Sequence, residues 1–74
     1  MNVICRHASD DFDALLTAQG MEDAGANVFS IVWLGKPGTH MAFGVYATYD
    51  RYETRPEDID KLIDKYRSHG PSNP

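Results

Sequence analysis

The chain has 74 residues, of which 42% are apolar, and its 7 lysine and arginine residues against 11 aspartate and glutamate residues give a formal net charge of −4. A chain of this length forms one small domain, which leaves no room for a large active-site cleft. The acidic balance argues against a general nucleic-acid-binding protein, and the single cysteine excludes an internal disulfide or a cysteine-based zinc site. No apolar run is long enough to span a bilayer and no signal-peptide pattern is present, so we expect a cytoplasmic protein.

The first predicted strand covers residues 2–6, where β-branched side chains are frequent. Ser9 is a good N-cap residue, and the acids that follow it suit the positive end of a helix: Asp10, Asp11 and Asp13. The apolar residues of this helix recur at i, i+3 and i+4, which predicts a buried stripe of Phe12, Leu15 and Leu16. Gly25 is expected to end the helix.

Two further strands, residues 28–34 and 41–49, flank the turn-forming segment 35–39 and should form a hairpin. Pairing Trp33 with Met41 would set Ile31 opposite Phe43 and gather the bulky side chains, with Phe29, on one face of the sheet.

Pro56 is expected to open a second helix, with Gly70 ending it and residues 71–74 forming a disordered tail. The apolar residues of this helix give the clearest amphipathic pattern in the chain: Ile59, Leu62, Ile63 and Tyr66.

The order β-α-β-β-α over residues 1–70 predicts a single α+β domain. A crossover makes the first two strands parallel, and the long third strand should lie between them, giving the strand order 1-3-2. Both helices would cover one face, so the fold resembles a truncated ferredoxin-like two-layer sandwich. The predicted core is Ile4, Phe12, Leu15, Leu16, Phe29, Ile31, Trp33, Phe43, Val45, Ile59, Leu62, Ile63 and Tyr66.

Residues suited to catalysis or metal binding are few and scattered. Cys5 and His7 share a strand face, but no orienting acid or oxyanion donor accompanies them. The other histidines, His40 and His69, stand at no metal-ligand spacing. We therefore expect no enzyme activity, no metal and no cofactor.

Residues 41–49 resemble the first ribonucleoprotein motif of RNA-recognition domains, in which Phe43 and Gly44 match. Met41 replaces the basic residue of that motif and Val45 replaces its second stacking aromatic residue. This resemblance implies an alternative function, a small nucleic-acid-binding module that uses Phe43, Tyr46 and the arginines within residues 51–55.

The charge is unevenly distributed, because residues 9–35 hold five acids and no lysine or arginine, whereas residues 36–74 hold six charges of each sign. The five acids are Asp10, Asp11, Asp13, Glu22 and Asp23. They form either a solvated helix face or an acidic patch that docks on a basic partner.

Two other surfaces are candidates for partner binding. Tyrosine and arginine, which dominate binding hot spots, cluster after the third strand at Tyr49, Arg51 and Tyr52. The sheet face opposite the helices should expose apolar residues and predicts a homodimer: Val28, Val32, Leu34, Ala42 and Tyr46.

In its short, acidic, single-domain format without a catalytic constellation, the chain resembles the small phage-encoded inhibitors of the anti-CRISPR class. This resemblance implies a non-enzymatic protein in the host cell cytoplasm. It implies that the acidic helix replaces phosphates on the basic surface of a nucleic-acid-handling protein complex and blocks access of nucleic acid.

Overall fold

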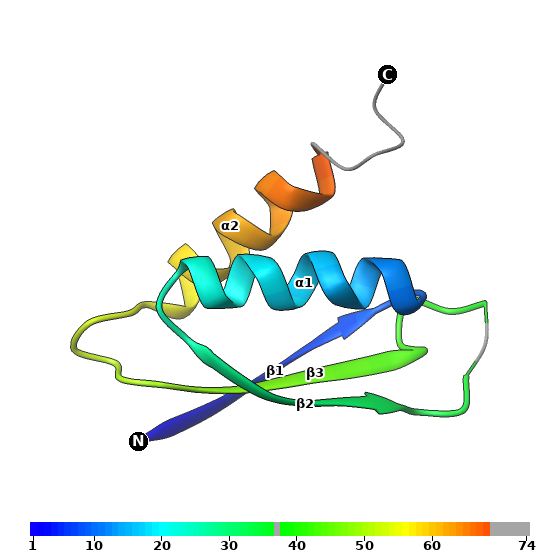
Figure 1. The fold of residues 1–74 in the computed structure, drawn as a ribbon, viewed down its shortest axis with the longest axis horizontal. Helices are drawn as coiled ribbons and strands as arrows, with labels where there is room; N and C mark the ends of the chain where they lie inside the picture. The colour runs from blue at the N-terminus through cyan, green and yellow to red at the C-terminus, as the bar shows by residue number, and fades with distance from the viewer. Residues whose placement is uncertain (37, 69–74) are drawn as a thin grey trace.

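The computed structural model describes residues 1–36 and 38–68. Its elements are β1 (Asn2–Ala8), α1 (Asp11–Asp23), β2 (Asn27–Trp33), β3 (Phe43–Tyr49) and α2 (Pro56–Ser68). The strands form one sheet in the order β1-β3-β2, in which β3 is antiparallel to both neighbours (Figure 1). The predicted α+β class, element order and strand order are confirmed.

The ends of the elements differ from the prediction by a few residues. Asp10, not Ser9, caps α1, because its side chain accepts a hydrogen bond of 2.7 Å from the backbone N–H of Asp13. Gly25 follows the helix with a φ of 99°, a left-handed conformation that favours glycine, so its predicted role is confirmed. Pro56 opens α2 as predicted, whereas Gly70 and the predicted tail lie outside the described residues.

The hairpin register is shifted by two residues from the prediction. Trp33 pairs with Phe43 instead of Met41, and Ile31 pairs with Val45. Because side chains alternate with a period of two, this shift leaves the side chains from Ser30 to Trp33 on their predicted faces, whereas Val28 pairs with Ala47 and lies on the core side. The connecting loop is correspondingly longer than the predicted turn.

A β-bulge between Val28 and Ser30 makes the prediction for Phe29 wrong. The bulge inserts Phe29 as an extra residue, and its ring lies 6.4 Å from the ring of Tyr46, centroid to centroid. Tyr46 lies on the sheet face away from the helices, since its neighbours Val45 and Ala47 are buried in the core. Phe29 therefore leaves the core and is 61% exposed.

Helix α1 lies against the sheet, and α2 packs on α1 (Figure 1). The residues that α1 buries are mostly small: Ala14, Thr17, Gly20 and Met21. The predicted stripe is wrong in its largest members, because Phe12 and Leu15 are 44% and 61% exposed. Small side chains face inward because α1 contacts both the sheet and α2, and bulky ones would hold these neighbours apart.

The buried hydrophobic core is assembled from Ile4, Ala8, Ala14, Met21, Ala26, Val45, Ala47, Ile59 and Ile63. Members of the predicted core that are only half-buried are Leu16, Phe43, Leu62 and Tyr66. The members that are exposed, contrary to the prediction, are Phe12, Leu15, Phe29, Ile31 and Trp33.

The two helices lie in close contact at Gly20. A Cβ atom at this position would lie 2.6 Å from both the Cα and the backbone nitrogen of Ile63. These are backbone atoms of α2, so no side-chain rotation could relieve the overlap. An ion pair joins α2 to the sheet. The Arg6 guanidinium in β1 donates to both carboxylate oxygens of Asp60 in α2, at 2.6 and 3.0 Å.

We expect Gly20→Ala to destabilise the fold by about 2 kcal/mol or more, because the added methyl group forces α1 and α2 apart. Urea denaturation followed by circular dichroism measures the change. Gln19→Ala is the matched control: Gln19 is the exposed neighbour, and its replacement should change the free energy of unfolding by less than about 0.5 kcal/mol. Equal stability of Gly20→Ala and the native chain would contradict the close approach of the helices.

Candidate interaction surfaces

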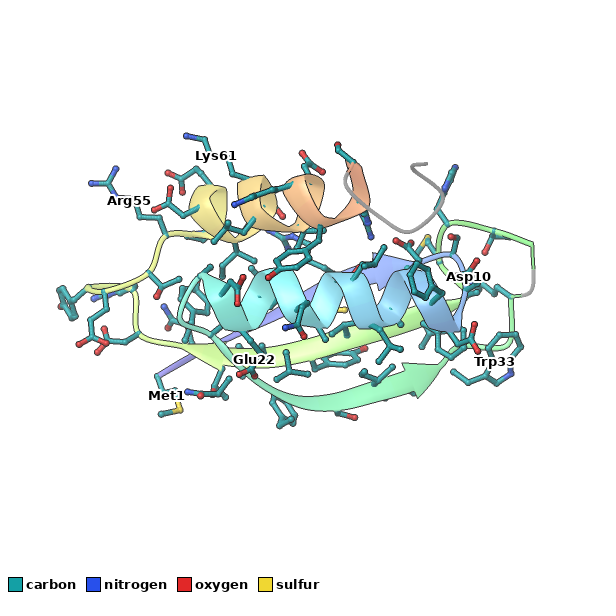
Figure 2. All side chains as sticks on the ribbon, turned by 45° about the horizontal axis from the view of Figure 1, so that its top comes forward. Met1, Asp10, Glu22, Trp33, Arg55 and Lys61 are labelled. Atoms are coloured by element: carbon teal, nitrogen blue, oxygen red, sulfur yellow. The ribbon has the colours of Figure 1, made fainter. Side chains whose placement is uncertain are left out.

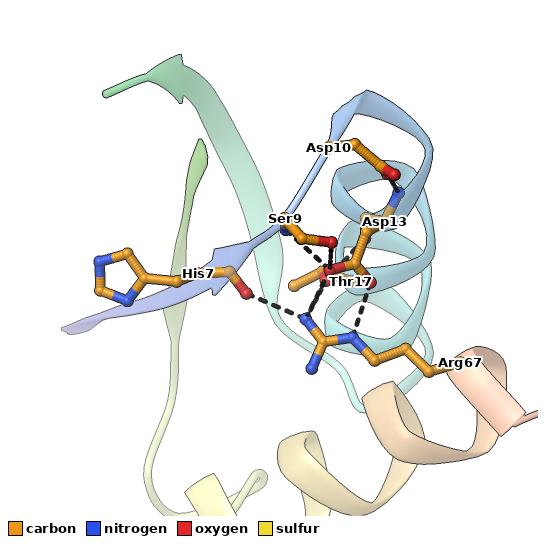
Figure 3. Close-up of polar contacts among 6 residues, drawn as sticks. All are labelled: His7, Ser9, Asp10, Asp13, Thr17 and Arg67. Carbon is orange, nitrogen blue, oxygen red and sulfur yellow. Dashed lines mark hydrogen bonds and ion pairs between the residues drawn. The ribbon is translucent and has the colours of Figure 1, made fainter. Parts of the chain in front are cut away.

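The carboxylate of Asp13 stabilises the fold by bonding to groups from other elements (Figure 3). Arg67 of α2 donates to it through Nε at 2.8 Å, and the same guanidinium donates to the carbonyl of His7 and the hydroxyl of Thr17, both at 2.9 Å. Asp13 also accepts hydrogen bonds from the backbone N–H and the hydroxyl of Ser9. This cluster joins β1, α1 and α2, so Asp13 is half-buried and its charge is paired.

The other four acids of the predicted patch are exposed and accept hydrogen bonds from uncharged donors. Asp10 and Asp11 accept from backbone N–H groups at the start of α1. Glu22 accepts from the N–H of Val28 at 2.6 Å, and Asp23 accepts from the phenol of Tyr66. The bond with Asp23 raises the pKa of Tyr66 above its ordinary value. Neutral donors leave the carboxylate charges uncompensated, so these four acids give α1 a negative surface.

The structure divides these four acids between the two ends of α1. Asp11 and Asp23 are the first and last residues of the helix, so about 18 Å of helix separates them. Asp10 and Trp33 lie at the same end of the molecule, and Glu22 lies toward the other (Figure 2). The predicted patch is therefore two small acidic groups, one at each end of the helix.

The predicted tyrosine–arginine cluster forms part of a turn after β3. The Arg51 guanidinium stacks on the ring of Tyr52, 5.3 Å from its centroid, and Tyr52 is 86% exposed. Tyr49 instead packs partly against the core. The hydroxyl of Thr54 donates to the carbonyl of Ala24 at 3.0 Å, which fixes this turn beside the C-terminal end of α1.

A shallow depression adjoins this turn and is lined by Met1, Asn2, Asp50, Arg51 and Tyr52. The lining residues that the structure describes include no arrangement of nucleophile and base. Within residues 1–36 and 38–68, no group of three or more histidine, cysteine or acidic side chains is placed to hold a metal ion. Neither described helix is both long and apolar enough to traverse a membrane.

The two aromatic residues of the RNA-binding alternative lie on opposite faces of the sheet. Phe43 faces the helices and its ring packs edge-on against Trp33, with 5.2 Å between centroids. Tyr46 lies on the open face, where a hydrogen bond with the side chain of Cys5 raises the pKa of its phenol. One base-stacking platform cannot contain both rings, and this geometry does not favour the alternative.

The apolar face predicted to form a homodimer is smaller than the sequence indicates. Val32, Leu34 and Tyr46 lie on the open side of the sheet, but Val28 packs against the core and Ala42 is 1% exposed. The homodimer stays a prediction.

A surface that the sequence prediction missed lies along β2 and the neighbouring side of α1. Ile31 and Trp33 face the helix layer yet are 43% and 54% exposed. The hydrogen bond from the N–H of Val28 to the Glu22 carboxylate joins β2 to α1, where Leu15 is 61% exposed. The sequence signal that could have indicated this surface is the run of apolar residues on both faces of β2.

Comparison of the chain with protein-family models, with curated proteins and with solved structures finds no match. The case for function therefore rests on the surfaces described above.

We expect Arg67→Lys to lower the free energy of unfolding by about 1–2 kcal/mol, because an ammonium group cannot reach all the acceptors that the planar guanidinium reaches. Arg55→Lys is the control, since Figure 2 shows the Arg55 side chain directed away from the molecule. Chemical denaturation of both variants measures the difference. The structural role of the Asp13–Arg67 cluster would be refuted by equal stabilities of the two variants.

Proposed function

We propose that this chain is a non-enzymatic interaction protein, an inhibitor of the anti-CRISPR type that acts in the host cell cytoplasm. Its exposed carboxylates on α1 bind a basic surface of a nucleic-acid-handling protein complex. The observation that carries the proposal is that Asp10, Asp11, Glu22 and Asp23 are exposed and accept hydrogen bonds from uncharged donors, in a stretch without lysine or arginine. Such carboxylates gain most from meeting an external cation.

The start of α1 is the better supported of the two acidic groups. Asp10 and Asp11 adjoin Phe12, which is 44% exposed, and Trp33 lies at the same end of the molecule (Figure 2). Protein interfaces typically combine an apolar centre with a charged rim. Glu22 and Asp23 form the second group, and a large partner could contact both groups.

The mechanism would be competition for a basic channel. Carboxylates on α1 would occupy lysine and arginine side chains that otherwise bind phosphates, so nucleic acid could not enter. Opposite charges accelerate association, and salt screens them over about 8–10 Å. Inhibition should therefore weaken as ionic strength rises.

The test uses purified CRISPR effector complexes of several types, each loaded with its guide RNA, and measures target-DNA binding by gel mobility shift. We expect the chain to inhibit at least one complex, and Asp11→Lys to raise the inhibitory concentration about tenfold or more. Asp11 is the informative position because, among residues 1–36 and 38–68, its side chain bonds only to the adjacent backbone N–H. Asp64→Lys makes the same charge change at an exposed position of α2 and should inhibit like the native chain.

Three outcomes would count against this function. Failure to inhibit any effector would remove the anti-CRISPR assignment. Native inhibition by both Asp11→Lys and Asp23→Lys, with loss of inhibition in Tyr52→Ala, would move the binding surface to the turn after β3. Direct retention of bare RNA by the chain would favour the nucleic-acid-binding alternative.

A further inference from the structure

Strand β2 is an edge strand, and from Phe29 to Trp33 its exposed side chains are apolar on both faces. Ile31 and Trp33 on one face and Val32 on the other are 43%, 54% and 39% exposed. Residues 26–35 contain no charged side chain. Natural proteins usually protect edge strands with charges, prolines or bulges, because an unprotected edge pairs with other strands.

The backbone of β2 offers hydrogen-bonding groups along this edge. The N–H of Leu34 donates to the carbonyl of Ala42 at 2.8 Å, so it points toward β3. Backbone groups of an antiparallel strand alternate in direction from one residue to the next. The N–H and C=O groups of Trp33 and Ile31 therefore point away from the sheet.

Protection of this edge is confined to its first half. The N–H of Val28 is covered by the Glu22 carboxylate at 2.6 Å, and the bulge at Phe29 interrupts the regular edge beside it. From Ser30 to Leu34, neither a covering carboxylate nor a bulge protects the edge. The free part of the edge is thus short and centred on Val32.

We propose that a second copy of this chain pairs with β2 edge to edge, antiparallel, about a two-fold axis at Val32. In this register Ile31 of each copy lies opposite Trp33 of the other and exchanges two backbone hydrogen bonds with it. The two sheets join into one of six strands, and Ile31 and Trp33 cover each other's exposed surfaces on the helix side. This inference is independent of the proposed function.

Charge complementarity identifies a second copy as the occupant. The paired segments are uncharged, so two copies of an acidic protein meet there without repulsion. Lys36, the first charged residue after β2, is exposed, and antiparallel pairing carries it toward the Val28 end of the other copy, where Glu22 lies. The two-fold axis creates this opposite-charge contact twice.

The association closes at two copies. Pairing of β2 with β2 uses the same patch on both chains and leaves only β1 edges exposed. The strand β1 differs from β2, since it carries Arg6 and His7. The contact is short compared with the roughly 800 Å² per partner of a standard interface, so we expect dissociation in the micromolar range.

The experiment measures the mass of the full chain by sedimentation between about 1 and 500 µM, together with the fluorescence of Trp33. We expect the mass to rise from 8.3 kDa toward twice that value, and the emission of the single tryptophan to shift to shorter wavelength in parallel. A mass of one copy throughout this range overturns the proposal, as does growth beyond two copies.

Matched variants locate the contact. Ile31→Lys places a charge at the centre of the pairing edge and should abolish the mass increase, while circular dichroism stays native because Ile31 is already 43% exposed. Val3→Lys makes the same change on the other edge strand, at a residue that is 62% exposed, and should dimerise like the native chain. Dimerisation of Ile31→Lys with loss in Val3→Lys would overturn the proposal and point to the open face.

A charge exchange tests the register, and circular dichroism first checks that both variants fold, because Glu22 also bonds the N–H of Val28. Glu22→Lys alone and Lys36→Glu alone place like charges at both symmetric contacts and should each weaken dimerisation. An equimolar mixture of the two variants restores both opposite-charge contacts in a heterodimer. Recovery of the native dimer mass in the mixture supports the proposal, and a mixture no better than its components overturns this register.

Discussion

The fold depends on the close approach of α1 and α2 at Gly20, where the helix backbones leave no space for a Cβ atom. This contact lets α1 pack against the sheet and α2 at once. It requires small residues on both packed sides, which Ala14 and Thr17 supply. Of the larger apolar residues of α1, Met21 is fully buried, whereas Phe12 and Leu15 face outward. Close helix packing thus leaves part of the apolar surface of α1 exposed.

The elements and their order could be predicted from the sequence because local signals were strong. Pro56 and Gly25 mark helix ends, and alternation marks the faces of β3. The buried face of α1 could not be predicted in the same way, because apolar periodicity favours large residues such as Leu15, whereas close packing selects small ones. The bulge at Phe29 was also invisible, since it arises from the pairing of β2 with β3.

For the acidic residues too, some features follow from the local sequence and others from tertiary contacts. The sequence established their number and clustering, but not which of them the fold uses. Asp13 pairs with Arg67, which is 54 residues away along the chain. Within the described part of the chain, Asp11 has only a local hydrogen bond, and no basic side chain pairs with its charge. Acids that look alike in the sequence therefore have different roles in the structure. Only the geometry distinguishes the carboxylate of Asp13, which pairs with Arg67, from the exposed carboxylates.

The absence of charge along β2 is informative because charge is frequent elsewhere. Charged residues make up 24% of the chain, so a stretch as long as 26–35 would hold about two if they were evenly spread. This stretch includes the edge strand, where a charge would prevent pairing with other chains.

Charged residues lie only at the two ends of this uncharged stretch. The Glu22 carboxylate bonds the N–H of Val28 near its beginning, and Lys36 follows its end. Charges of opposite sign at the two ends of an uncharged edge favour antiparallel pairing of identical copies. Any parallel arrangement would set like charges side by side. Edge pairing and the charge distribution therefore lead to the same two-fold arrangement.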